Sequence, residues 1–294
     1  MSQNKPTVDE HYVPRFYLKQ FTEDDEHIYQ YDVLSGRCCP NTVPINSICY
    51  KKNLYEFRGE NGEFIGRNLI EKSFMMYEGA FANVFRSIKA KTNDVRNMRT
   101  LSFLTEKEKA FLTVFIATMI IREPGLIQSL TETTSDIFEN QISDRMAKNL
   151  VLQTGLPIYQ EINVEESNLF NAVLGFFEDM SFQIGKTDSD IIWTSDTPVF
   201  LYGDSNSVRV HAVLVPLSPC LVLTMKPYAQ TERELYNRFL VLNDIKSVNR
   251  IIVSHCKRWI YSKEQFTDKQ ISWIKKVRNW KQKSCSHSNA ESAG

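Results

Sequence analysis

The sequence has no excess of charge of either sign and no long hydrophobic segment. Its 294 residues include 35 Lys and Arg against 35 Asp and Glu, so the formal net charge is zero. A balanced chain lacks the bulk field that favours nucleic acid or anionic membrane as a partner, although a local patch can still exist. The longest apolar run, residues 110–121, contains two threonines and is shorter than the roughly 20 residues that cross a bilayer. The polar start also lacks the apolar centre of a signal peptide, so we expect a soluble, cytoplasmic protein with no membrane partner.

Common motifs of nucleotide and metal chemistry are also missing. The sequence has no Gly-x-Gly-x-x-Gly, no Walker-type lysine loop, no Gly-x-Ser-x-Gly and no His-Glu-x-x-His. Its six cysteines include no Cys-x-x-Cys pair, and in a cytosolic chain of this size they are expected to be reduced thiols. A zinc site built from His11, Cys38 and Cys49 stays conceivable. No cofactor is therefore evident, and a divalent metal remains an option.

The pattern of apolar residues predicts both strands and helices. Alternation between polar and apolar residues indicates strands, whereas apolar residues three and four apart indicate helices. Thr105 and Glu108 form a capping box for a helix through Ile121, which is apolar nearly all round and should be buried. Pro124 cannot continue the helical hydrogen bonds, so the helix should end before it. Strands are expected at residues 27–33, 53–57, 191–193, 208–217, 220–225 and 250–255, and further helices after Pro14, from about Gly66, at 130–152, after Asn163, at 230–245 and at 268–283.

These elements predict an α+β fold in one domain over residues 1–284. An N-terminal small β region (1–62) precedes a helical middle (63–185), and a C-terminal mixed sheet with a closing helix (186–284) follows. The small, polar residues 285–294 are expected to form a flexible tail.

Two short motifs stand far apart in the chain. The first is His11-Tyr-Val-Pro-x-x-Tyr-Leu-x-x-Phe21, and the second is Trp193-Thr-Ser-Asp-x-Pro-Val199. Both resemble the signature sequences of a bacterial family, the domain of unknown function 4238 family, and the likeness covers nearly the whole chain. This family brings no settled chemistry. Some members are similar to single-gene antiphage systems, so the resemblance implies a role in phage defence.

His11 and Arg15 are the first candidates for chemistry. Histidine titrates near neutral pH and can move protons or bind metal, and an arginine guanidinium can hold phosphate through two hydrogen bonds. The alternative is that His11 bonds backbone and pins the N-terminal segment. Tyr17 could stack on a base of a nucleic-acid substrate, or it could belong to the core, because it shares helical spacing with other aromatic residues.

Ser195 and Asp196 are the candidates in the second motif. Asp196 could be a metal ligand or a base at the end of a strand, and Ser195 could be a nucleophile if His11 or His211 supplied the base. The alternative is that both side chains satisfy backbone N–H groups in a tight turn before Pro198.

Arg122 and Asn243 complete the candidate set. Arg122 ends an apolar helix, where a buried charge needs a partner. Either it forms a structural salt bridge, perhaps with Glu78, or it turns into a cleft and recognises an anion. Asn243 could bind a substrate through its amide, although such a residue is more often found in a turn or at a helix terminus.

Two hypotheses about function follow. The first is a toxic effector that acts on a phosphate-containing substrate in the manner of a nuclease, with His11, Arg15, Arg122 and Asp196 converging on a phosphate. The second is a non-catalytic sensor or binding module that recognises a phage component. This second hypothesis predicts that these residues have structural roles and that the surface carries an exposed apolar or basic patch instead. The expected partner is a phage component or nucleic acid.

Overall fold

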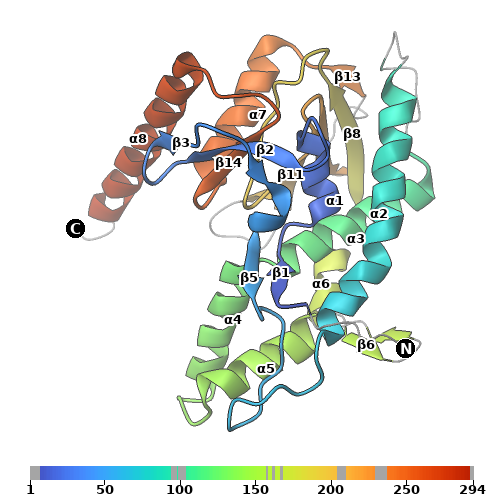
Figure 1. Ribbon diagram of the computed structural model, residues 1–294, viewed down its shortest axis with the longest axis vertical. Helices are drawn as coiled ribbons and strands as arrows, with labels where there is room; N and C mark the ends of the chain where they lie inside the picture. The colour runs from blue at the N-terminus through green and yellow to red at the C-terminus, as the bar shows by residue number, and fades with distance from the viewer. Residues whose placement is uncertain are drawn as a thin grey trace. The chain divides into compact units, whose positions relative to one another are not determined.

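The chain divides into two compact units, each assembled from segments that are distant in the sequence. The first unit contains residues 1–14, 49–94 and 102–180, and the second contains residues 15–48, 95–101 and 181–294. The combination of helices with mostly antiparallel sheets confirms the α+β class (Figure 1). The single domain expected over residues 1–284 stays a prediction. The structure, a computed structural model, describes residues 7–93, 98, 104–156, 158–160, 163–165, 168–203, 210–228 and 237–291.

The first unit is mainly helical and includes two short strand ladders. Strands β1 and β5 pair antiparallel, with Glu10 opposite Lys51 and His11 opposite Tyr50. Helices α4 and α5 pack against each other as a helical hairpin (Figure 1). The elements are β1 (Asp9–His11), β5 (Tyr50–Lys52), α2 (Leu69–Asn93), α3 (Glu106–Ile121), α4 (Pro124–Ile137), α5 (Asp144–Gly155), β6 (Ile158–Gln160), β7 (Asn163–Glu165) and α6 (Asn168–Gly175).

The second unit contains two larger sheets and three helices among its described residues. One sheet has the strand order β10-β11-β12-β8-β13, and the other has the order β3-β2-β14-β9, with β4 paired to β2. The elements are α1 (Arg15–Leu18), the 3-10 turns η1 (Lys19–Phe21) and η2 (Ile45–Ser47), β2 (His27–Asp32), β3 (Arg37–Cys38), β4 (Val43–Pro44), β8 (Met180–Lys186), β9 (Thr194–Ser195), β10 (Phe200–Gly203), β11 (Val210–Ser218), β12 (Leu221–Pro227), β13 (Arg238–Phe239), α7 (Leu242–His255), β14 (Trp259–Ser262) and α8 (Asp268–Glu291).

The capping box and the buried helix after it are confirmed. The Thr105 hydroxyl accepts from the Glu108 N–H at 3.2 Å, and the Glu108 carboxylate accepts from the Thr105 N–H at 2.8 Å. Burial alone would raise the pKa of Glu108, but hydrogen bonds from Lys91, Ser87 and Thr105 outweigh it and lower the pKa to about 2. This carboxylate therefore ties the start of α3 to α2.

Aromatic packing joins α2 to α3. The Phe115 side chain is 1% exposed, and its ring meets those of Phe81 and Phe85 edge-on at centroid distances of 5.4 and 5.2 Å. Edge-to-face pairs of this kind add to the free energy of burial itself. Helix α3 is thus a core element of the first unit.

Helix α3 ends at Ile121, before Pro124, as predicted, but the helices after it differ from the predicted ones. Pro124 starts α4, because proline fits the first helical position, where its missing N–H has no partner to lose. The single helix predicted at residues 130–152 is wrong: Glu139 and Asn140 take left-handed backbone conformations and separate α4 from α5. The helix expected after Asn163 is also later, since Asn163 lies in β7 and α6 begins at Asn168.

The strand predicted at residues 250–255 is wrong, because these residues form the end of α7. Ile245, Val248, Ile252 and Val253 are buried, and their spacing is that of one helix face. Considered alone, the apolar residues near 252–253 fit a short strand. The helical spacing becomes visible only when Ile245 and Val248 are included. Of the helix predicted at 230–245, residues 230–236 lie outside the described residues, and β13 occupies 238–239.

Two other strands begin or end elsewhere than predicted. Strand β5 stops at Lys52, because Asn53 has a left-handed φ of 51° and turns the chain away. Residues 191–193 precede β9 and are not themselves a strand. The Asn249 amide of α7 donates to the Ile191 carbonyl at 2.8 Å and accepts from the Trp193 N–H at 3.1 Å, and the Ile192 N–H donates to the Pro219 carbonyl at 2.9 Å.

The closing helix α8 starts at the predicted residue, Asp268, and continues to Glu291. It therefore runs beyond the expected end at 283 and into the predicted tail, of which residues 292–294 lie outside the described part of the chain. In the parts of the chain that the structure describes, no single helix has the length and hydropathy of a membrane span. Helices α3 and α4 reach those values only as a pair bent by 60°.

Replacing Phe115 with alanine should lower the free energy of unfolding by about 3–5 kcal/mol, because it removes a buried ring that two other rings contact. Denaturant melts would measure this loss. Phe176, which is 47% exposed, is the matched control, and Phe176→Ala should change stability by less than about 1 kcal/mol. Equal small losses for both variants would show that α3 is not part of the core.

Candidate functional site

Arg122 is a buried hub of the first unit. Its side chain is 1% exposed; Nη1 donates to Glu78 Oε1 at 3.2 Å, and Nη2 donates to the His11 carbonyl. The guanidinium lies over the Phe74 ring, 4.2 Å from its centroid, and the Arg122 carbonyl accepts from the Tyr55 hydroxyl at 2.8 Å. Of the two alternatives for Arg122, the structural salt bridge with Glu78 is the one present.

His11 ends β1 and is brought to Arg122 through its backbone. The His11 carbonyl takes the guanidinium hydrogen bond, while the imidazole packs at 5.7 Å from the Tyr50 ring, measured between centroids. Arg122 therefore fixes the end of β1 whatever the protonation state of this imidazole.

Asp196 anchors a loop in the second unit. The residue is 4% exposed, and its carboxylate accepts from the backbone N–H groups of Lys257, Arg258 and Trp259 at 3.0, 2.8 and 3.1 Å. Burial raises the pKa of Asp196, and these three hydrogen bonds oppose the rise. The carboxylate thus closes the connection between α7 and β14.

Ser195 and Tyr17 lie in the same buried region as Asp196. The Ser195 hydroxyl accepts from the Thr197 N–H at 3.2 Å, which is the turn expected before Pro198. The Tyr17 hydroxyl donates to the Pro216 carbonyl and bonds the Thr194 hydroxyl, both at 2.8 Å. Tyr17 is fully buried and contributes to the core.

The remaining candidates, Arg15 and Asn243, are exposed at the first turns of α1 and α7. His11 and Arg122 belong to the first unit, whereas Arg15, Tyr17, Ser195, Asp196 and Asn243 belong to the second. A site shared by His11 and Asp196 therefore stays a prediction.

Both sequence motifs fall within one family match. The model of a family described as protein of unknown function (DUF4238) matches residues 10–266. The chain belongs to this family. No curated protein and no solved structure matches it.

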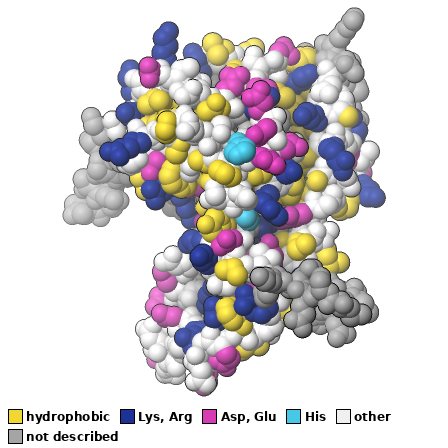
Figure 2. Space-filling model, in the orientation of Figure 1, with side chains coloured by type: hydrophobic (Ala, Val, Ile, Leu, Met, Phe, Trp, Pro, Cys, Tyr) yellow, Lys and Arg dark blue, Asp and Glu magenta, His cyan; other side chains and the backbone are white. Residues whose placement is uncertain are grey.

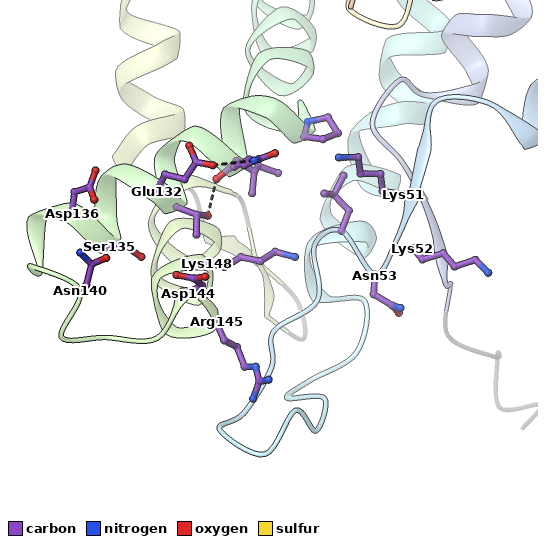
Figure 3. A pocket seen from close by; sticks show the side chains of 15 residues that line it. Lys51, Lys52, Asn53, Glu132, Ser135, Asp136, Asn140, Asp144, Arg145 and Lys148 are labelled. Carbon is purple, nitrogen blue, oxygen red and sulfur yellow. Dashed lines mark hydrogen bonds between the residues drawn. The ribbon is translucent and has the colours of Figure 1, made fainter. Parts of the chain in front are cut away.

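The first unit of this DUF4238 protein also contains a pocket of about 720 Å³, within the range of small-molecule sites (Figure 3). Its walls are α4, α5 and the segment from Lys51 to Leu54. Lys and Arg side chains gather on the lower part of the face in Figure 2, over the region where Figure 1 places these elements. We call it the Lys51–Lys148 pocket, after two of the residues that line it.

Lys51 and Lys148 supply positive charge to the pocket. Lys148 extends from α5 toward the β5 segment, and Lys51 extends toward α4 (Figure 3). Among the described residues, neither ammonium group forms a hydrogen bond or an ion pair. Burial lowers the pKa of Lys148; Glu10 opposes this effect, and the charges of Arg58 and Lys51 add to it. An anion placed between the two lysines would relieve this repulsion.

Glu10 provides only partial compensation for the charge of Lys148. It is fully buried, its Oε2 accepts from the Tyr55 N–H at 2.8 Å, and its Oε1 has no partner among the described residues. Burial raises the pKa of Glu10 to about 7 against the effect of the Tyr55 hydrogen bond, and Glu56 adds to the rise. At neutral pH this carboxyl is therefore only partly ionised.

A metal centre finds no support in the described part of the chain, where no group of three or more His, Cys, Asp or Glu side chains could hold a metal ion. Of the three residues considered for zinc, His11 and Cys49 lie in the first unit and Cys38 lies in the second. The divalent metal stays an untested prediction.

Sequence reasoning missed Lys51 and Lys148. They are 97 positions apart, and each reads as an ordinary surface lysine in its own segment. Only the placement of β5 beside the α4–α5 hairpin brings them together. Predicting two helices in place of one at residues 130–152 would have placed Ser135, which also lines the pocket, on α4 and Lys148 on α5. The sequence offered no other indication of this pocket.

Asp196→Ala should destabilise the protein by about 2–4 kcal/mol, because it leaves three backbone N–H groups without their acceptor. Thermal melts would measure the loss, and the exposed Asp188→Ala is the matched control. A variant that melts normally but has lost biological activity would instead favour the catalytic role expected for Asp196.

Proposed function

We propose that this DUF4238 protein is an antiphage defence protein that works as a binding module and recognises a phosphate-bearing phage component. The defence role rests on the similarity of some members of the family to single-gene antiphage systems. The observation that supports binding is the Lys51–Lys148 pocket, where the ammonium groups of Lys51 and Lys148 face a cavity and form no ion pair with a described residue. Phosphate is the anion that lysine commonly binds as a point charge.

The contacts of the candidate catalytic residues favour binding over catalysis. Arg122 is buried among protein partners, and the carboxylate of Asp196 already accepts three hydrogen bonds. A nuclease-like effector requires these two groups to face a phosphate instead. This effector, with His11, Arg15, Arg122 and Asp196 converging on a phosphate, is the alternative function.

The test is phage plating on bacteria that express the wild type, the double variant Lys51→Met with Lys148→Met, and the control Lys72→Met. Lys72 is exposed on α2, away from the pocket lining. We expect the wild type and Lys72→Met to lower plating efficiency, and the double variant to lose most of this protection while it stays folded.

Two outcomes would contradict the proposal. Unchanged plating with the wild type across a broad phage panel would remove the defence role. Full protection by a folded double variant would remove the pocket from that role. If protection then disappeared in a folded His11→Ala variant, the effector alternative would be favoured.

A further inference from the structure

The Lys51–Lys148 pocket contains both cations and carboxylates. The cations come from β5 and α5, and the carboxylates are Glu132 and Asp136 of α4 and Asp144 of α5. Carboxylates repel phosphate but accept hydrogen bonds from hydroxyl and amino groups. A ligand that fills the pocket therefore needs a negative end and, apart from it, groups that donate hydrogen bonds.

Ser135 is the most informative residue on the α4 side. It is 6% exposed, and its hydroxyl forms no hydrogen bond with any described residue. Buried hydroxyl groups in proteins nearly always have a partner, so one without any indicates an additional group at this place. Ser135 lines the pocket together with Glu132 and Asp136, as the labelled side chains of Figure 3 show.

Glu132 retains acceptor capacity for such a group. Its Oε1 accepts from the Gln128 amide at 2.9 Å, and no bond to Oε2 occurs among the described residues. Of the other cations in the lining, Arg145 already donates to the carbonyls of Gly59 and Glu60. Lys52 extends away from the α4–α5 hairpin in Figure 3, whereas Lys51 and Lys148 extend into the cavity. Lys51 and Lys148 are therefore the cations placed for a phosphate.

Apolar side chains form a third part of the lining. Leu54, Pro124 and Ile127 are buried residues that also line the pocket. A flat ring can pack on such a surface. The volume of about 720 Å³ admits a small molecule but not a nucleic-acid duplex, whose diameter exceeds any cavity of this size.

We propose that this pocket binds a nucleotide-class ligand. Its phosphate lies between Lys51 and Lys148, its ring packs on Leu54, Pro124 and Ile127, and its hydroxyl or amino groups donate to Glu132 and Ser135. The inference rests on the proposed function in that it names the ligand class of the same pocket. Binding itself can be measured without any phage.

The experiment is isothermal titration of the purified full chain with three probes: ribonucleoside 5′-monophosphates, the matching nucleosides and inorganic phosphate. We expect at least one monophosphate to bind ten or more times tighter than its nucleoside and than phosphate. Lys51→Met and Lys148→Met should each weaken monophosphate binding about tenfold or more. Lys72→Met, the matched control, should not.

The α4 side has its own test. Ser135→Ala and Glu132→Gln should weaken monophosphate binding and leave the weak binding of inorganic phosphate unchanged, because they contact only the organic part. Thermal melts check that every variant is folded, and the exposed Lys51 keeps the test valid if Lys148→Met is unstable.

Three results would overturn the inference: no binding of any monophosphate, equal affinity for monophosphate and inorganic phosphate, or binding that the lysine and α4 variants leave unchanged. Failure of the defence role is a separate result. Nucleotide binding without any effect on phage plating would retain the inference and remove the proposed function. Phage protection that depends on Lys51 and Lys148, in a protein that binds no nucleotide, would retain the proposed function and remove the inference.

Discussion

The buried guanidinium of Arg122 is the interaction on which the arrangement of the first unit depends. Through Glu78 and Phe74 it ties the end of α3 to α2, and through the His11 carbonyl it ties α3 to the end of β1. Strand β1 in turn fixes β5 by antiparallel pairing. Because α4 begins two residues after Arg122, the same contact sets both the α4 wall and the β5 wall of the Lys51–Lys148 pocket.

A buried charge with this role is sensitive to the loss of any one partner. Taking a guanidinium out of water costs several kcal/mol, which only good geometry and additional hydrogen bonds offset. The second unit uses the opposite charge in a comparable way, since Asp196 holds three successive backbone N–H groups at the entry to β14. Arg122 and Asp196 lie in or beside the segments that resemble the family. Such segments can therefore be similar because they stabilise the fold, and not only because they take part in a reaction.

The features that sequence predicted best are those determined by nearby residues. Thr105 and Glu108 are three positions apart, so their capping box could be recognised directly, and the alternation within β11 and β12 identified both strands. The Arg122–Glu78 pair was one of two open alternatives, because a buried charge requires a counterion. Residues 250–255 were misassigned, since their helical spacing appears only with Ile245 and Val248. The pocket could not be predicted, because Lys51 and Lys148 come together only through tertiary packing.

The most direct test of the account is the pKa of the Lys148 ammonium, measured by NMR of selectively labelled lysine with and without a nucleoside monophosphate. The account predicts a pKa below the ordinary lysine value in the free protein, because burial and the charges of Arg58 and Lys51 disfavour the ammonium. Added ligand should raise it, since a phosphate beside Lys148 favours the charged form. An ordinary pKa in the free protein, or one that saturating ligand leaves unchanged, would contradict the claim that this pocket is built for an anion.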